Sequence, residues 1–280
     1  MNEPEADRPP EQLPTLDDDI SEPEEEDSGS GAMSFLDHLE ELRWTLAKSF
    51  IAFGSACLLI GIFLTKFSDL LRWPYEFAIT GRDIEMSGLI NTSILGVFSV
   101  IFYLLLGGGL ALSLPFILYF VARFITPGLN ERELGVLRPA CFAAFALFMM
   151  GAVFSFFVLV PAALRASIIF NEMLGFAPMW TAASYYGMLT WMVLGVGVAF
   201  EFPLALLILV FVGILTHAQL VAFRKYSIVL FLCIGAVVTP TTDPVTFLLL
   251  AAPMTLLYEL AIIGARRLER KMAEDSEVED

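Results

Sequence analysis

The sequence predicts an all-α integral membrane protein with six transmembrane helices, on the grounds of its composition and of where its apolar residues fall. Of its 280 residues, 57% are hydrophobic and only 17% are charged, and the mean hydropathy is +0.74. Soluble domains have roughly 45–50% apolar and about 25% charged residues. The apolar residues form long continuous runs, and in lipid only helices or closed barrels satisfy their own backbone hydrogen bonds.

The net charge of −15 is concentrated at the termini. Residues 1–32 contain twelve acidic residues, a single base at Arg8 and no aromatic residue. Such a segment buries too little apolar surface to offset its chain entropy, so we expect a disordered acidic cytoplasmic tail. Residues 266–280 are expected to form a second charged, solvated tail. The six-span membrane domain then occupies residues 33–265 and is nearly neutral.

Six apolar runs lie between these tails, and a bilayer core of roughly 30 Å needs about 20 helical residues. They fall between Lys48 and Lys66, within residues 86–122 with a start near Asn91–Thr92, over residues 139–161, over residues 186–213, between Lys225 and Asp243, and from Pro244 to near Arg266. The last two spans are short. About 13 helical residues in the fifth give about 20 Å, which predicts local thinning of the bilayer, docking of another helix, or burial among neighbouring helices.

The distribution of basic residues predicts the orientation. With six spans, twelve Lys and Arg residues fall in the N-terminal region, the C-terminus and the even loops, against four in the odd loops. The positive-inside rule therefore places both termini in the cytoplasm. Before the first span, Leu36, Leu39, Leu42 and Leu46 repeat at helical spacing. This stripe predicts an amphipathic helix at the membrane surface that continues into the first span.

The sequence offers little for catalysis. It has two histidines and three isolated cysteines, and it lacks the HExxH, GxSxG and phosphate-loop patterns. We therefore expect no enzyme activity, metal site, cofactor or nucleic-acid partner. Three consecutive glycines, residues 107–109, lie in an apolar run and favour close helix packing over ligand binding.

Two acidic clusters are predicted on the cytoplasmic side. Glu41 lies on the polar face of the first amphipathic segment, and Glu131 and Glu133 follow the helix-breaking pair Pro127-Gly128. Each has an ordinary explanation, as a solvated helix face or as acids that complement a helix dipole. Together on one membrane face, they also suggest a receptor for a basic segment.

Glu201 is the exceptional charge, because it lies in the middle of the fourth span, two residues before Pro203. A charge at the bilayer centre costs roughly 2.5–3.5 kcal/mol on insertion scales. Pro203 removes a backbone hydrogen bond and is expected to kink the helix. These features favour a functional carboxylate facing a groove or water over a purely structural hydrogen bond. Glu259, near the end of the sixth span, is expected to pair with Arg266 or Arg267.

Several motifs in chain order resemble the TatC family, the core subunit of the twin-arginine protein translocase. They are HLEELR at 38–43, LPFILY at 114–119, FITPGL at 124–129, FEFP at 200–203, Thr239-Pro240 with Asp243, and Pro253 with Leu257-Tyr258-Glu259. Together they cover roughly residues 34–265. Pro115 and Pro203 are the prolines of the second and fourth motifs.

The resemblance implies roles for individual residues. Glu41 and Arg43 would belong to one part of a signal-peptide site, and Phe124 and Glu133 to its loop part. Glu201 would be the intramembrane acid facing a concave groove. Further family positions are Pro74 in the first periplasmic loop, Thr239 where a partner helix docks, and Thr246 or Phe247 near the start of the sixth span.

The implied function is export of folded proteins across the bacterial cytoplasmic (inner) membrane. Proteins of this family bind Arg-Arg signal peptides of precursors at the cytoplasmic face, assemble with the single-span partners TatA and TatB, and use the proton-motive force. A homo-oligomer within the receptor complex, in contact with membrane lipid, is also expected. The alternative is a proton-coupled small-molecule transporter that uses Glu201, but such folds commonly contain repeats, and no persuasive internal repeat is visible here.

Overall fold

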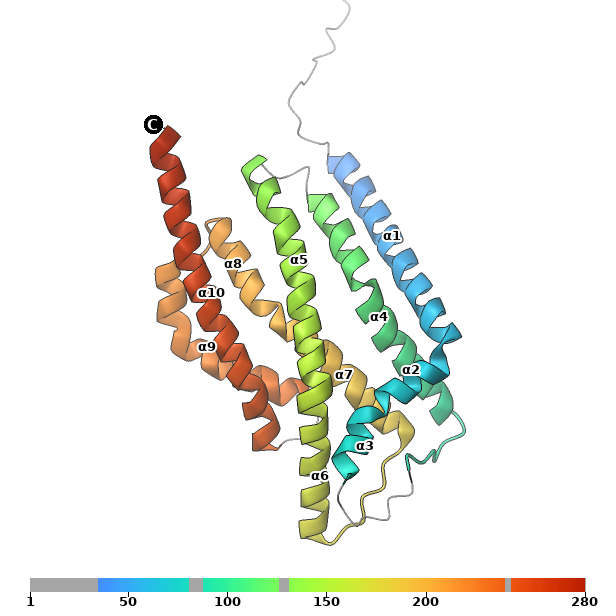
Figure 1. The fold of residues 1–280 in the computed structure, drawn as a ribbon. Helices are drawn as coiled ribbons and strands as arrows, with labels where there is room; N and C mark the ends of the chain where they lie inside the picture. The colour runs from blue at the N-terminus through green and yellow to red at the C-terminus, as the bar shows by residue number, and fades with distance from the viewer. Residues whose placement is uncertain (1–34, 81–87, 126–130, 240–242, 280) are drawn as a thin grey trace, which may run out of the picture.

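The structure, a computed structural model, describes residues 35–80, 88–125, 131–239 and 243–279, and most of these residues are helical (Figure 1). The helices are α1 (Phe35–Ile62), α2 (Leu64–Leu71), α3 (Trp73–Ile79), α4 (Gly96–Ile125), α5 (Glu131–Phe154), the π-helix η2 (Ser155–Leu159), α6 (Val160–Leu174), α7 (Ala182–Phe200), α8 (Phe202–Phe211), α9 (His217–Val238) and α10 (Pro244–Glu279). Within these ranges the β pairing is limited to one bridge, between Ile90 and Thr181. The predicted tail of residues 1–32 lies outside the described residues.

Six helical segments are long and apolar enough to cross a membrane, which confirms the predicted number. They are His38–Ile62, Gly96–Phe124, Pro139–Leu174, Ala182–Phe211, His217–Val238 and Pro244–Arg270. The third combines α5, η2 and α6, and the fourth combines α7 and α8. The predicted amphipathic segment forms the first turns of α1 and shares its axis (Figure 1). Leu39, Leu42 and Leu46 of its apolar stripe are exposed, as contact with lipid requires.

Two predicted helix boundaries are wrong. The second span begins at Gly96, because Asn91 instead accepts a hydrogen bond from the Ser93 N–H in a turn before the helix. The third span continues beyond Pro161 to Leu174. The π-helical turn just before Pro161 accommodates this proline, which lacks the N–H of a normal helix residue.

The helices α9 and α10 each extend beyond the apolar run from which the sequence predicted the fifth and sixth spans. α9 has 22 residues because Thr216 and Gln219 form a capping box that starts the helix at His217, well before Lys225. Its wholly uncharged part, residues 226–238, remains as short as predicted. α10 has 36 residues and ends at Glu279, so the charged segment predicted as a tail continues the sixth helix.

Helices α2 and α3, which the sequence did not predict, form a bent segment after the first span. The hydroxyl of Tyr185 donates to the Leu71 carbonyl at 2.6 Å, and the hydroxyls of Tyr186 and Ser68 are 2.7 Å apart. Pro74 occupies the first turn of α3 and is fully buried. Arg165 of α6 donates to the Phe77 carbonyl at 3.2 Å. These bonds tie the bent segment to α6 and α7.

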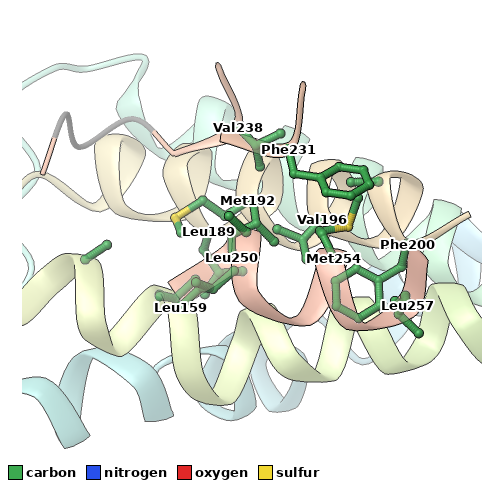
Figure 2. Close-up of a cluster of buried hydrophobic side chains, with 14 of the residues drawn as sticks. Leu159, Leu189, Met192, Val196, Phe200, Phe231, Val238, Leu250, Met254 and Leu257 are labelled. Carbon is green, nitrogen blue, oxygen red and sulfur yellow. The ribbon is translucent and has the colours of Figure 1, made fainter. Parts of the chain in front are cut away.

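The core is formed where α7, α9 and α10 meet beside η2 (Figure 2). Met192 and Val196 of α7 are fully buried against Phe231 of α9 and Met254 of α10. Because lipid tails are as apolar as these side chains, close van der Waals packing holds such helices together more than exclusion of water does.

Glycines allow the closest helix contacts. At the crossing of α5 and α7, a Cβ on Gly151 would lie 2.9 Å from the Val196 carbonyl oxygen, and one on Gly197 would lie 2.6 Å from the Phe148 ring. The predicted packing role of residues 107–109 is confirmed, because a Cβ on any of them would crowd a side chain of α7, α2 or α1.

We predict that Gly151→Ala destabilises the protein, because a rigid backbone oxygen occupies the space of the new methyl group. Overpacking of this kind costs roughly 1–3 kcal/mol. Gly54→Ala on α1 is the matched control, since nothing lies within 4 Å of its Cβ position, and we expect it to be neutral or stabilising. Thermal unfolding of the detergent-solubilised variants followed by circular dichroism measures both. Equal midpoints for the two variants would contradict the tight crossing.

Candidate functional site

The starts of α1 and α5 and the end of α4 lie together at one end of the bundle, called here the upper end (top of Figure 1). The rings of His38 on α1 and Phe124 on α4 stack there, with centroids 4.5 Å apart and planes 24° apart. This contact joins two predicted site segments that are more than eighty residues apart in the chain. It places Phe124 beside the first turns of α1.

Glu41 lies on the same face of α1 as His38, because residues three apart are neighbours on a helix surface. Its side chain is partly buried, and its Oε2 atom is buried without a hydrogen-bond partner among the described residues. A buried carboxylate oxygen without a donor is costly, and most such atoms in folded proteins are paired. Glu41 thus has an unused acceptor one helical turn from His38, the residue that stacks on Phe124.

Arg43 lies on a different face from Glu41, since residues two apart on a helix do not face each other. Its guanidinium group is 3.2 Å from the Glu40 carboxylate, and these two side chains are 71% and 62% exposed. An exposed pair of this kind contributes at most about 1 kcal/mol. Arg43 is therefore a surface residue at the upper end, separate from the buried side of Glu41.

Glu133 lies in the first turn of α5, at the same end of the bundle as Glu41 (Figure 1). Its side chain lies outside the described part of the structure. The backbone therefore brings both acidic clusters to the upper end, and the convergence of their carboxylates stays a prediction.

Glu201 lies where the fourth span is interrupted. α7 ends at Phe200 and α8 begins at Phe202, with Pro203 in its first turn, so the predicted break is present. Gly197, one turn earlier on the same face, packs against Phe148 of α5, which directs Glu201 toward α5. The Oε1 atom of Glu201 is buried without a hydrogen-bond partner among the described residues.

The described polar side chains at the corner between α9 and α10 are buried within the protein. Asp243 precedes α10, and its Oδ1 atom accepts from the Thr246 N–H at 2.8 Å and from the Thr246 hydroxyl at 2.9 Å. Thr239 ends α9 and donates to the Gly235 carbonyl at 2.8 Å. Thr239, Asp243 and Thr246 are 2%, 4% and 0% exposed, whereas Val237 and Val245 are 71% and 67% exposed. In the described part of this corner, Val237 and Val245 therefore present an apolar outward surface.

The predicted pairing of Glu259 with Arg266 or Arg267 is wrong. Its carboxylate instead forms two 2.8 Å contacts with the guanidinium group of Arg224 on α9. Arg266 and Arg267 lie about two helical turns further along the same helix, roughly 10 Å away. The antiparallel packing of α9 on α10, reinforced by a hydrogen bond from the Tyr258 hydroxyl to the Leu220 carbonyl, brings in the distant arginine.

Three further findings concern a predicted proline, metal ligands and the ring stack. Pro115 is retained inside α4 without ending it. Within the described residues, no group of three or more His, Cys, Asp or Glu side chains could hold a metal ion. Sequence reasoning missed the stack of His38 on Phe124, because such pairing between helices has no local pattern.

Comparison with known proteins gives one consistent family. The family model described as Sec-independent protein translocase protein (TatC) matches residues 37–253. A Koribacter versatilis protein named Sec-independent protein translocase protein TatC is 32% identical over 249 residues, covering 89% of this chain and 90% of that one. An Aquifex aeolicus protein of the same name is 34% identical over 247 residues, covering 86% and 98%. A crystal structure of a twin arginine translocase receptor, TatC, is similar with a TM-score of 0.66 and 31% identity, covering 83% and 99%.

We predict that Asp243→Ala lowers the free energy of unfolding by about 0.5–2 kcal/mol, because it removes the N-cap of α10. Thr246→Val, which loses one of the two bonds to Asp243, should have a smaller effect. Thr255→Val is the control, since the Thr255 hydroxyl only adds a bond to the Ala251 carbonyl within the helix. Thermal unfolding in detergent would give the order Asp243, Thr246, Thr255. A Thr255 effect as large as that of Asp243 would exclude the capping role.

Proposed function

The chain belongs to the TatC family of Sec-independent translocase proteins, and from this we propose that it binds Arg-Arg signal peptides at its upper end. It is a multi-pass membrane protein and a twin-arginine translocase subunit. The observation that carries the proposal is the carboxylate oxygen of Glu41, unpaired among the described residues, one helical turn from the His38 ring that stacks on Phe124. An incoming guanidinium group would supply the missing donor.

The recognition chemistry favours arginine over lysine. A guanidinium group is planar and presents paired donors that match a carboxylate, whereas an ammonium group does not. A hydrogen bond to a charged group contributes roughly 1.5–3 kcal/mol where it is shielded from solvent. Glu41 offers one acceptor, and Glu133, in the first turn of α5, is proposed to offer the second. Phe124 would contact the apolar part of the peptide.

We place the upper end in the cytoplasm and the protein in the bacterial inner membrane. The excess of Lys and Arg in the even loops and at the termini supports this orientation. Twin-arginine precursors would then meet the site before they cross the membrane.

The proposed partners are single-span proteins of the TatA and TatB type, which would dock at the corner between α9 and α10. Val237 and Val245 expose an apolar surface there. The uncharged part of α9 is shorter than the hydrocarbon layer, so a neighbouring helix would reduce the mismatch. Thr239 and Thr246 would act indirectly, by fixing the shape of this corner. More than one copy of the chain would assemble in the receptor complex.

Glu201 is proposed to act in the transport step, which uses the proton-motive force. Its carboxyl group lies at the break between α7 and α8 and has an unpaired oxygen. Ionisable groups within membrane spans commonly belong to pathways or assembly contacts. In this proposal, Glu41 binds the signal peptide, and Glu201 acts in partner assembly or in transport.

We predict that Glu41→Ala or Glu133→Ala abolishes photocrosslinking of an Arg-Arg signal peptide to this protein in membranes. Either change removes an acceptor for a guanidinium group. Glu76→Ala, an exposed acid on α3 away from the upper end, is the control, and a Lys-Lys peptide should crosslink weakly to the wild type. Unchanged crosslinking in both the Glu41 and Glu133 variants would refute the site.

We predict that Glu201→Ala retains signal-peptide crosslinking but strongly reduces precursor transport into inverted membrane vesicles. Glu201→Gln keeps the shape of the side chain and tests whether its charge is needed. Loss of crosslinking in the Glu201 variants would show that this residue serves recognition instead. Uptake of a small solute by liposomes under a pH gradient would favour a proton-coupled transporter.

A further inference from the structure

A hollow of about 1000 Å³ lies between α4 and α5 toward the upper end of the bundle. It extends along the membrane-spanning part of α4 from Pro115 to Arg123. Its volume is at the top of the roughly 300–1,000 Å³ range typical of small-molecule sites. Neither the proposed peptide contacts nor the proposed partner surface uses this space.

The walls of the hollow are two facing helix surfaces. On α4, Pro115, Tyr119 and Arg123 follow one another at four-residue spacing and so share a face. On α5, Gly135 and Phe142 are seven residues apart and also share a face. The Phe142 side chain is 74% exposed and that of Tyr119 is 58% exposed, so the hollow is open toward the surrounding lipid.

The polarity of the hollow changes along the membrane normal. Its lower part is bounded by apolar side chains such as Pro115 and Phe145. Tyr119 lies higher, and tyrosines are enriched at the level of lipid headgroups. Arg123 is one turn above Tyr119, in the last turn of α4, and is exposed. No residue in the described part of the chain forms an ion pair with Arg123.

This arrangement complements one class of molecule. Arg123, a cation without an ion-pair partner among the described residues, matches a phosphate group at the interface, and the apolar space directly below it matches acyl chains. Basic pockets between transmembrane helices commonly bind anionic lipid headgroups. A purely apolar partner helix would leave Arg123 without a counter-charge, and a soluble anion would leave the apolar walls uncovered.

We propose that the hollow between α4 and α5 binds an anionic phospholipid, with its phosphate on Arg123 and its acyl chains along Tyr119, Gly135 and Phe142. The lipid would fill the space between two helices whose ends carry Phe124 and Glu133. It would therefore support the relative position of α4 and α5. The lipid proposal rests on the shape of the hollow and on the charge of Arg123, and it is independent of the signal-peptide proposal.

The first test counts bound lipids by native mass spectrometry of the full chain in neutral detergent. Phosphatidylglycerol and phosphatidylcholine are added in competition. We expect wild-type protein to retain phosphatidylglycerol with about a fivefold preference, the effect of one basic residue near an anionic group. Arg123→Gln should remove the preference. Arg267→Gln, which neutralises an exposed arginine on α10, should keep it.

The second test uses Cys141, which lines the hollow, as a reporter of position. With Cys57 and Cys233 replaced by alanine, phosphatidylglycerol should slow alkylation of Cys141 by a maleimide at least twofold, whereas glycerol phosphate should not. Gly135→Leu should weaken retention of both lipids, because it fills the hollow. Nothing lies within 4 Å of the Cβ position of Gly135, so this change is compatible with folding even if the Arg123 variant is not.

Three results would overturn the proposal. The first is equal retention of the two lipids by wild-type protein, and the second is an unchanged preference after Arg123→Gln. The third is protection of Cys141 by an Arg-Arg signal peptide but not by phosphatidylglycerol, which would assign the hollow to the peptide.

Discussion

The architecture depends on one constraint: inside a bilayer each polar group needs a partner from the protein itself. Each helix pairs its own backbone N–H and C=O groups. A buried side-chain atom without a hydrogen-bond partner is therefore an exception that needs an explanation. Among the described residues, three of them are carboxylate oxygens, on Glu41, Glu201 and Asp243. Glu201 lies at a helix break and Asp243 at a helix start, where backbone geometry departs from the regular pattern, whereas Glu41 lies in the second turn of α1. Two of these three carboxylates, Glu41 and Glu201, thus coincide with positions that the family resemblance implies for function.

Prolines and glycines make these exceptions possible without unfolding the spans. Pro203 has no N–H to donate, so the interruption at Glu201 leaves one fewer donor unpaired. Pro161 is accommodated by the π-helical turn that precedes it. Gly151 and Gly197 let α5 and α7 approach closely one turn before the break. The position of the Glu201 carboxyl group therefore depends on the packing of α5 against α7 as well as on the break between α7 and α8.

Length and polarity along the chain were sufficient to predict six spans, because apolar length alone decides whether a helix can cross lipid. They were insufficient for helix ends, because polar residues also form helix outside the bilayer. The capping box at Thr216 and the charged end of α10 are examples. The partner of Glu259 was predicted wrongly because it comes from packing between helices, which brings Arg224 of α9 into contact. For the candidate site, the sequence identified Glu41 and Glu201 as unusual but gave no indication of the ring stack that positions Phe124.

The proposed recognition at the upper end would require α1, α4 and α5 to keep a fixed spacing, since two guanidinium groups on a short peptide span a limited distance. α1 is held to α4 by the stack of His38 on Phe124 and by its close approach to Gly108 and Gly109. Between α4 and α5, by contrast, the hollow replaces direct packing toward that end. Among the described residues, a weak S–H contact of 4.0 Å from Cys141 to the Leu118 carbonyl crosses between these two helices. An occupant of the hollow would therefore act directly on the relative position of α4 and α5, and through it on the spacing between Phe124 and the first turn of α5, which carries Glu133.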